Sequence, residues 1–276
     1  MTDKNRNLLF RLASAAVLLP LVVYLLYLGG IYLACLLGFA AAAVAWEYMK
    51  ITLKDPAPIA WLGVAFAAVL PIFPVWKPVE TTAWYLGLAG GYFYLVWGYH
   101  LLKGPLAEAP TRSAHLLTAV TYGSLGMTTL SALRELPSGM WWVVATLVIT
   151  WGNDTAAYFA GRFLGKHKLY PEVSPNKTWE GFAGGMVGSI GGLFIVKYGF
   201  FPQMSVLDCV ALGALGGVLG PMGDLCESML KRAYGVKDSG NIIPGHGGML
   251  DRIDALLFNA PAALLYVQFL RPLLSL

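Results

Sequence analysis

The sequence predicts an all-α, polytopic membrane protein of about nine transmembrane helices with the N-terminus inside and the C-terminus outside. Of its 276 residues, 57% are hydrophobic and only 12% are charged, and the mean hydropathy is +0.63. A soluble domain carries about 25% charged residues, so this chain has too few charges to cover a surface in water. Apolar stretches of roughly 20 residues, the length that crosses a bilayer core, recur along the chain.

Nine apolar stretches qualify as candidate spans, and Gly- and Pro-rich turn signals separate most of them. They cover residues 12–28, 31–49, 58–76, 82–102, 114–133, 140–160, 182–196, 206–222 and 250–270. The fifth is diluted by Thr, Ser and Gly, and the seventh is short. The first is long for the apolar part of a signal peptide and is followed at once by another apolar stretch, so we interpret it as a retained helix.

The positive charges indicate the orientation of these spans. With the N-terminus in the cytoplasm and nine alternating spans, 14 of the 19 Lys and Arg residues fall in cytoplasmic segments and 4 in outer segments, and Arg252 lies just inside the ninth span. The positive-inside rule predicts this asymmetry. We therefore expect an integral protein of the bacterial cytoplasmic membrane, with its polar loops on the cytoplasmic side.

Polar content divides the chain into two regions. Residues 1–137 hold spans one to five and are expected to form a scaffold that faces lipid or a second copy in a homodimer. Residues 138–276 hold spans six to nine, and polar residues crowd two cytoplasmic loops there, 161–181 and 223–249. Pairs of Gly residues four positions apart in the seventh and eighth spans favour close helix packing. The three cysteines form no CxxC pair, which indicates buried thiols rather than disulfides or a zinc site.

Acidic residues at the cytoplasmic ends of the last two spans suggest a metal site. If the eighth span continues as a helix, one face carries two carboxylates, a hydroxyl and an ammonium group: Asp224, Glu227, Ser228 and Lys231. Asp251 and Asp254 open the ninth span one turn apart. Carboxylates that close repel each other unless a cation lies between them, and oxygen ligands suit Mg²⁺. The alternatives are a solvated helix end with Asp–Ser and Glu–Lys pairs, and a paired Asp–Arg cap.

The two polar loops contain candidates for phosphate binding. In the first, Ser174 before Pro175 predicts a helix start, and a helix N-terminus with Lys177 beside it is a ready anion site. In the second, the Gly- and Pro-rich stretch 237–248 lets backbone amides approach a phosphate, although a flexible loop is the alternative. His246 could act as a base, a phosphate contact or a structural hydrogen bonder, and spacing does not decide among these.

About a dozen residues in the last third of the chain follow a fixed spacing over about 27 positions. They are Ser228, Lys231, Arg232, Lys237, Asp238, Gly240, Pro244, His246, Gly247, Gly248, Asp251, Arg252 and Asp254. This pattern closely resembles the signature of the phosphatidate cytidylyltransferases, also called CDP-diacylglycerol synthases. Blocks 154–162 and 174–181 resemble that family as well, so the resemblance covers roughly residues 153–259. Ala156 stands where many members have Gly, which is a packing difference.

The resemblance implies that phosphatidate and CTP react to give CDP-diacylglycerol and pyrophosphate, with Mg²⁺ and room for a second cation. It implies CTP, phosphatidic acid and the lipid bilayer as partners, and no nucleic acid. The metal ligands would be Asp224, Asp251 and Asp254. The catalytic residues would be Lys231, Arg232, Lys237, Asp238 and Arg252. The substrate-binding residues would be Ser174, Asn176, Lys177, Thr178, Ser228, His246, Gly247 and Gly248.

Other functions fit part of the pattern. A transporter would also use buried acids and helices interrupted by Gly, but this chain shows no internal repeat, and its charges cluster at one membrane face rather than at the midplane. A different CTP-using lipid enzyme, for instance one that acts on archaeal-type lipids, would share the charge pattern. A purely structural bundle would not explain the intramembrane carboxylates.

Overall fold

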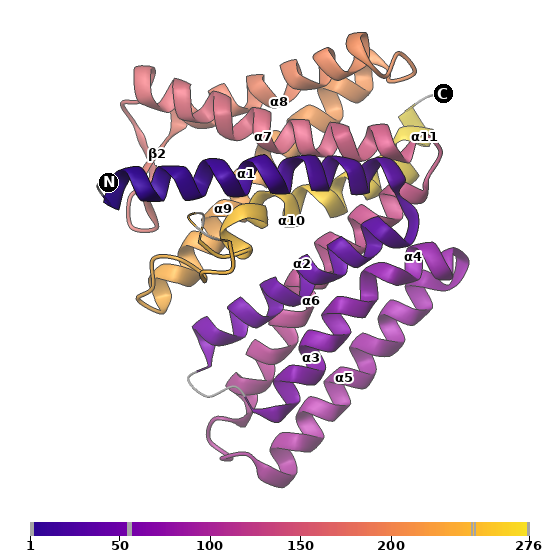
Figure 1. The fold of residues 1–276 in the computed structure, drawn as a ribbon, viewed down its shortest axis with the longest axis vertical. Coiled ribbons are helices and arrows are strands. Elements are labelled where there is room, and N and C mark those ends of the chain that lie inside the picture. Colours follow the sequence, from indigo (N-terminus) through magenta and orange to yellow (C-terminus); the bar gives the residue numbers. More distant parts are fainter. Residues whose placement is uncertain (1–2, 54–56, 244, 246, 275–276) are drawn as a thin grey trace. The chain divides into compact units, whose positions relative to one another are not determined.

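The computed structural model describes residues 3–53, 57–243, 245 and 247–274. They are mostly helical, with one two-stranded hairpin (Figure 1). The chain forms two compact units: the first combines Met1–Glu135 with Tyr234–Arg252, and the second combines Leu136–Ala233 with Ile253–Leu276. The chain therefore leaves the second unit after Ala233, joins the first for the loop before the last long helix, and returns at Ile253.

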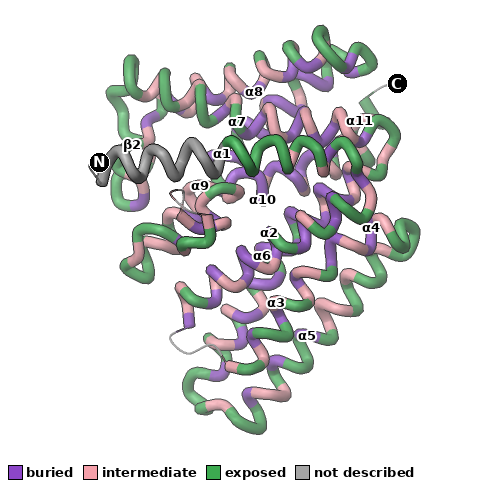
Figure 2. The backbone as a smooth tube through the Cα atoms, in the orientation of Figure 1, coloured by how far each residue is buried: buried purple, intermediate pink, exposed green. Residues whose placement is uncertain are grey.

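The first unit is built on three helices, α2, α3 and α6, which pack against one another. Its helical segments are α1 (Asp3–Leu28), α2 (Gly30–Thr52), α3 (Pro58–Val69), η1 (Leu70–Ile72), α4 (Phe73–Trp76), η2 (Pro78–Glu80), α5 (Thr81–Lys103) and α6 (Ala109–Glu135). A Cβ on Gly123 would lie 2.6 Å from the Ala41 carbonyl oxygen, so α6 approaches α2 at backbone distance. Figure 2 shows that α5 and the later part of α1 keep largely exposed surfaces, as expected of helices that face lipid.

The second unit is built on α7 and α8, with α9 packed against them. Its elements are α7 (Gly139–Leu164), β1 (Lys168–Tyr170), β2 (Ser174–Thr178), α8 (Trp179–Gly199), α9 (Val206–Ala233), α10 (Leu250–Leu265), the π-helical segment η3 (Tyr266–Leu270) and α11 (Arg271–Leu274). The first turn of α10 belongs to the first unit and the remainder of the helix to the second.

Six helical segments in the described part of the chain are long and apolar enough to cross a membrane. They are Gly30–Thr52, Pro58–Trp76, Ala109–Glu135, Trp179–Gly199, Val206–Ala233 and Leu250–Leu274. A shorter apolar stretch, Ala16–Leu28, lies within the first predicted span, 12–28. The two remaining predicted spans lie in α5 and α7, which are long enough but rich in Tyr, Trp and Gly. The chain is therefore an integral membrane protein with an α-helical fold.

Two local predictions about the first polar loop are wrong. Residues 174–178 form a strand, not a helix start, and α8 begins only at Trp179. Pro175 disfavours helical backbone at the residue before it, and antiparallel pairing of β2 with β1 keeps the segment extended. The seventh span is also longer than the predicted 182–196, because its helix covers Trp179–Gly199.

Small residues allow α7 and α8 to lie in close contact, as their spacing predicted for the seventh span. A Cβ on Gly188 would lie 2.5 Å from the Gly152 carbonyl oxygen and would also collide with Ala156. The same holds between α8 and α9, where a Cβ on Gly213 would lie 2.8 Å from the Cα of Ile190. Larger side chains at these positions would hold the helices further apart.

The first turn of α9 is held by a buried carboxylate. Asp208 is only 2% exposed, and its Oδ2 accepts from the backbone N–H of Ser205 at 2.7 Å. Its Oδ1 accepts from the hydroxyl of Tyr266 at 2.8 Å and from Arg271 Nε at 3.2 Å. These contacts join the start of α9 to η3 and α11 at the C-terminal end of the chain. This end of α9 is the one that is remote from the polar loops.

Replacing Gly188 with alanine is expected to destabilise the second unit by about 1–3 kcal/mol, because the added methyl meets backbone and the Ala156 side chain. Thermal unfolding of the purified protein in one detergent measures the change. Gly191→Ala is the matched control on the same helix, since nothing lies within 4 Å of its Cβ position, and it should be neutral or slightly stabilising. Equal unfolding of the two variants would contradict the packing described here.

Candidate functional site

A short hairpin connects α7 to α8 and carries several predicted site residues. Thr178 ends β2 and caps α8, because its side-chain oxygen accepts the Gly181 N–H at 3.1 Å. Glu180 in the first turn of α8 accepts from the backbone N–H of Lys166 at 3.1 Å and from His167 Nδ1 at 2.6 Å. Local caps and a carboxylate therefore fix the base of the hairpin against both helices.

A cavity of about 600 Å³ lies between this hairpin and the ends of α7, α8 and α9. Three cationic side chains line it, Arg162, Lys168 and Lys177, together with two carboxylates, Asp154 and Asp224. The remaining lining residues are Asn153, Ala157, Tyr158, Gly161, Gly165, Leu169, Asn176, Thr178, Gly181, Phe182 and Pro221. Its size is that of a site for a small ligand, and its cations suit an anionic one.

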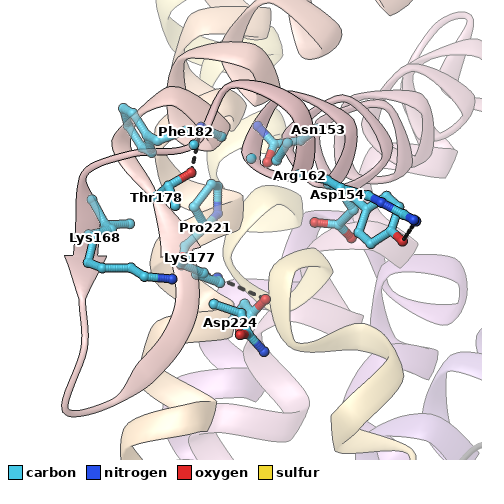
Figure 3. Close-up of a pocket in the computed structure, with 16 residues that line it drawn as sticks. Asn153, Asp154, Arg162, Lys168, Lys177, Thr178, Phe182, Pro221 and Asp224 are labelled. Atoms are coloured by element: carbon cyan, nitrogen blue, oxygen red, sulfur yellow. Dashed lines mark hydrogen bonds and ion pairs between the residues drawn. The ribbon is translucent and has the colours of Figure 1, made fainter.

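Lys177 and Asp224 form the central ion pair of this cavity. Lys177 Nζ lies 2.8 Å from Asp224 Oδ2, and Figure 3 shows the lysine reaching from β2 toward the aspartate on α9. Both side chains keep partial exposure, 23% and 35%, so a ligand can reach them. Lys177 Nζ also lies 3.5 Å from the carbonyl oxygen of Pro221, which lies inside α9.

Asp154, Asp224 and Asp254 form a cluster of negative charge around Lys177. The charges of Asp154 and Asp224 repel each other, and both repel that of Asp254, while Lys177 attracts Asp154 and Asp254. Hard oxygen ligands of this kind suit Mg²⁺. As they stand, no group of three or more His, Cys, Asp or Glu side chains among the described residues is tight enough to hold a metal ion.

Buried amides lie next to this cluster on the apolar side. Asn153 Nδ2 donates to Ser189 Oγ at 3.1 Å and to the carbonyl oxygen of Gly217 at 3.3 Å. Asn259 Nδ2 donates to Thr150 Oγ1 at 3.0 Å. These hydrogen bonds join α7, α8, α9 and α10 in the core of the second unit, so the acids are carried by helices in fixed register.

The predicted polar face on the eighth span is confirmed, because α9 continues as a helix to Ala233. Ser228 Oγ donates to Asp224 Oδ1 at 3.2 Å, and Lys231 Nζ lies 2.6 Å from Glu227 Oε2. Arg232 Nε donates to the carbonyl oxygen of Val173 at 3.4 Å. Ser228 is thus close to the cavity, whereas Lys231 and Arg232 make protein contacts about one turn further along α9.

The second polar loop belongs to the first unit and is organised around Asp251. Asp251 Oδ2 accepts from the backbone N–H groups of Ser239 and Gly248, each at 2.9 Å, and lies 3.0 Å from Ser239 Oγ. Gly247 has a φ of 86° and pairs with Ile243 in an isolated bridge, which requires glycine at that turn. His246 and Pro244 lie outside the described residues.

The remaining predicted residues of the two polar loops differ in exposure and in whether they line the cavity. Lys237, Asp238 and Arg252 are exposed. Ser174 is half-buried in β2 and does not line the cavity, whereas Asn176, Lys177 and Thr178 do. The structure therefore brings Asn176, Lys177, Thr178, Asp224, Ser228 and Asp254 together in the second unit.

Sequence reasoning missed Glu47, which holds the second loop from within the first unit. The residue is 2% exposed on α2, and its carboxylate accepts from the N–H groups of Met249 and Leu250 and from Ser239 Oγ. A lone acid in an apolar span was the available signal. Arg162 and Lys168 were also not predicted as site residues, although both lie in the first polar loop.

Comparison with known proteins gives a family and several relatives. The model of the cytidylyltransferase family matches residues 9–270. The phosphatidate cytidylyltransferase of Staphylococcus haemolyticus is 42% identical over 153 residues, which are 54% of this chain and 56% of that protein. That of Bacillus subtilis is 41% identical over 170 residues, 56% of this chain and 61% of that protein. That of Staphylococcus aureus is 40% identical over 149 residues, 54% and 56%. The chain thus spans little more than half the length of these curated relatives.

Lys177→Gln is expected to weaken the binding of inorganic pyrophosphate at least tenfold, because it removes one charge-assisted hydrogen bond from the cavity. Isothermal titration of the protein in detergent measures the dissociation constant. Lys103→Gln, at the exposed end of α5, is the matched control and should bind as the wild type does. Equal affinities of the wild type and Lys177→Gln would show that the cavity is not the anion site.

Proposed function

Because the chain belongs to the cytidylyltransferase family, we propose that it transfers CMP from CTP to phosphatidic acid, giving CDP-diacylglycerol and pyrophosphate. The observation that carries this proposal is the Lys177–Asp224 pair in a cavity lined by further cations. The relatives named above are phosphatidate cytidylyltransferases, and the signature residues 228–254 resemble that family independently of the cavity.

The proposed reaction needs no activated side-chain nucleophile. A phosphate monoester has a second pKa near ~6, so at neutral pH much of the lipid substrate carries two negative charges and can attack directly. An oxygen of the lipid phosphate forms a bond to the α-phosphorus of CTP, and the bond from that phosphorus to the oxygen bridging to the β-phosphate breaks. The electron pair leaves with pyrophosphate, and the charges balance without a proton transfer. The obstacle is repulsion between two polyanions.

The chain's own cations would lower that repulsion. Arg162, Lys168 and Lys177 line the cavity, where they can neutralise and orient phosphates. Asn176 and Thr178 would add polar contacts from the same hairpin. In this proposal Lys177 exchanges Asp224 for a phosphate oxygen when substrate enters, so the resting ion pair and the loaded site use the same lysine.

The predicted catalytic residues near the second loop remain part of the proposal. Lys237, Asp238 and Arg252 are exposed, so phosphates can reach them from outside. Lys231 would have to leave Glu227, and Arg232 would have to leave the Val173 carbonyl, before either could contact substrate. The described geometry therefore favours Lys237 over Lys231 and Arg232 for phosphate contact.

We include Mg²⁺ in the proposal, because the acids of the cavity repel one another and have the oxygen chemistry that this ion prefers. Asp224 and Asp254 would hold it, with Asp251 one turn before Asp254 on α10. When bound, the ion would neutralise phosphate charge and polarise the α-phosphoryl group. Lys177, freed from Asp224, would then be available to the substrate.

The proposed orientation has nine spans with the N-terminus inside and the C-terminus outside. It rests on the excess of Lys and Arg in the segments assigned to the cytoplasm. In that orientation the hairpin 165–178 and the loop 234–249 face the cytoplasm, where CTP is found, and the site opens at the inner surface of a bacterial cytoplasmic membrane. The bilayer then supplies phosphatidic acid from the side.

Asp254→Asn and Asp251→Asn are each expected to lower turnover at least about 100-fold, because the first removes a charge of the acid cluster and the second removes the carboxylate that organises the second polar loop. The assay is CTP- and Mg²⁺-dependent pyrophosphate release with phosphatidic acid in detergent micelles. Asp208→Asn is the control for loss of a buried carboxylate. Near wild-type turnover in both site variants would refute the metal assignment. As a readout without turnover, Mg²⁺ should raise the melting temperature of the wild type and not that of Asp254→Asn.

Alkaline phosphatase fused to the C-terminus is expected to be active in bacterial cells, because the proposed topology places that end outside and the enzyme folds only there. A fusion after Lys103 is the control and should be inactive, since that residue follows the fourth proposed span on the cytoplasmic side. The reverse pattern would invert the topology, and activity at both positions would change the number of spans.

A further inference from the structure

A buried carboxylate in the first unit holds the signature loop at three points. Glu47 Oε1 accepts from Met249 N at 2.9 Å, and its Oε2 accepts from Leu250 N at 2.8 Å and from Ser239 Oγ at 2.9 Å. Leu250 is the first residue of α10, so Glu47 supplies the negative charge that the helix N-terminus favours. The acid sits on α2, far from the loop in the sequence.

The hydroxyl of Ser239 connects Glu47 to Asp251. Ser239 Oγ lies 2.9 Å from Glu47 Oε2 and 3.0 Å from Asp251 Oδ2, and it accepts the Asp251 N–H at 3.3 Å. Ser239 is itself buried. A shift of the Glu47 carboxylate would therefore move the hydroxyl and, with it, the carboxylate of Asp251.

The loop backbone is shaped to admit Glu47. A Cβ on Gly240 would lie 2.5 Å from Glu47 Oε1, 2.9 Å from its Cδ and 3.1 Å from its Cγ, with no other residue among its nearest atoms. A Cβ on Gly248 would lie 2.6 Å from Glu47 Oε2 and would also collide with Ser239 Oγ. Gly240 has no positive φ, so the close approach of Glu47, and not backbone conformation, requires glycine at this position.

We propose that Glu47 is a positioning residue of the reaction, which holds loop 239–250 and the first turn of α10 in the geometry that Asp251 and Gly248 need to act. The inference rests on the proposed function for its catalytic consequence, but the anchor itself does not. By this proposal, turnover depends on one side chain of the N-terminal region, which was expected to serve as a scaffold.

The catalytic consequence is tested with Glu47→Gln, which keeps the shape of the side chain and removes its charge. The amide NH₂ of the glutamine would also face at least one of the groups that donate to Glu47, namely Ser239 Oγ, Met249 N and Leu250 N. We expect kcat for CTP-dependent pyrophosphate release to fall at least tenfold per folded enzyme, with KM for CTP changed less than threefold. Asp208→Asn is the matched control, because Asp208 is equally buried and also binds a helix start. It lies sixteen residues, or about 24 Å of helix, from Asp224 and should lower the melting temperature without lowering kcat.

The anchor is tested without turnover by hydrogen exchange. In Glu47→Gln the amides of Met249 and Leu250 should exchange at least tenfold faster than in the wild type, while Asp208→Asn leaves them unchanged. Unchanged exchange would overturn the anchor. Fast exchange with wild-type kcat would overturn the positioning role and leave the proposed function intact. If the wild type releases no pyrophosphate from CTP and phosphatidic acid, the proposed function fails, and the exchange result still decides the anchor.

A double-variant cycle tests the contact itself. Gly240→Ala alone should lower the melting temperature because the three atoms nearest to its methyl all belong to Glu47. In the Glu47→Ala background, which removes the three atoms nearest to this methyl, the same change should have a much smaller further effect. Additive effects of the two changes would show that Glu47 is not what excludes a side chain at Gly240.

Discussion

A carboxylate buried among apolar helices must be surrounded by donors, and this requirement organises both units of the protein. Removing an ionised group from water costs several kcal/mol unless hydrogen bonds or opposite charges replace the lost hydration. Glu47 in the first unit meets this requirement with two backbone amides and a hydroxyl. Asp208 in the second meets it with an amide, a phenol and a guanidinium. Each acid thereby fixes a helix start that would otherwise leave orphan N–H groups.

The two acids stabilise different parts of the structure, one a helix contact and the other a loop. Asp208 ties helices to one another at an end of the second unit that carries no predicted site residue, so its contacts serve packing. Glu47 fixes a loop whose backbone comes from distant sequence and whose residues match a family signature. The same physical demand therefore produces a structural lock in one place and support for a functional segment in the other.

Sequence periodicity predicted the features that depend on residues close together along one helix, namely side-chain pairs and the placement of small residues. The spacing of Asp224, Ser228, Glu227 and Lys231 correctly indicated two i, i+4 pairs, and the small residues of α8 correctly indicated close packing. It failed where pairing across the chain decides the local structure. Ser174 and Pro175 have the composition of a helix start, but the strand partner β1 keeps them extended. The partner of Glu47 at Ser239 is 192 residues away, a distance over which no local pattern carries information.

The cavity of the second unit shows how a site for polyanions remains stable before its ligand arrives. Arg162, Lys168 and Lys177 would repel one another in this cavity, and the nearby acids offset that repulsion. Lys177 and Asp224 satisfy each other at 2.8 Å, yet both remain partly exposed, so the pair is held less tightly than a fully buried one. A phosphate that binds Lys177 would draw it away from Asp224, which leaves the aspartate available to a cation. A cation that binds Asp224 would in the same way leave Lys177 available to a phosphate. Binding of anion and cation would therefore be mutually favourable, because the pair that each must break is the same one.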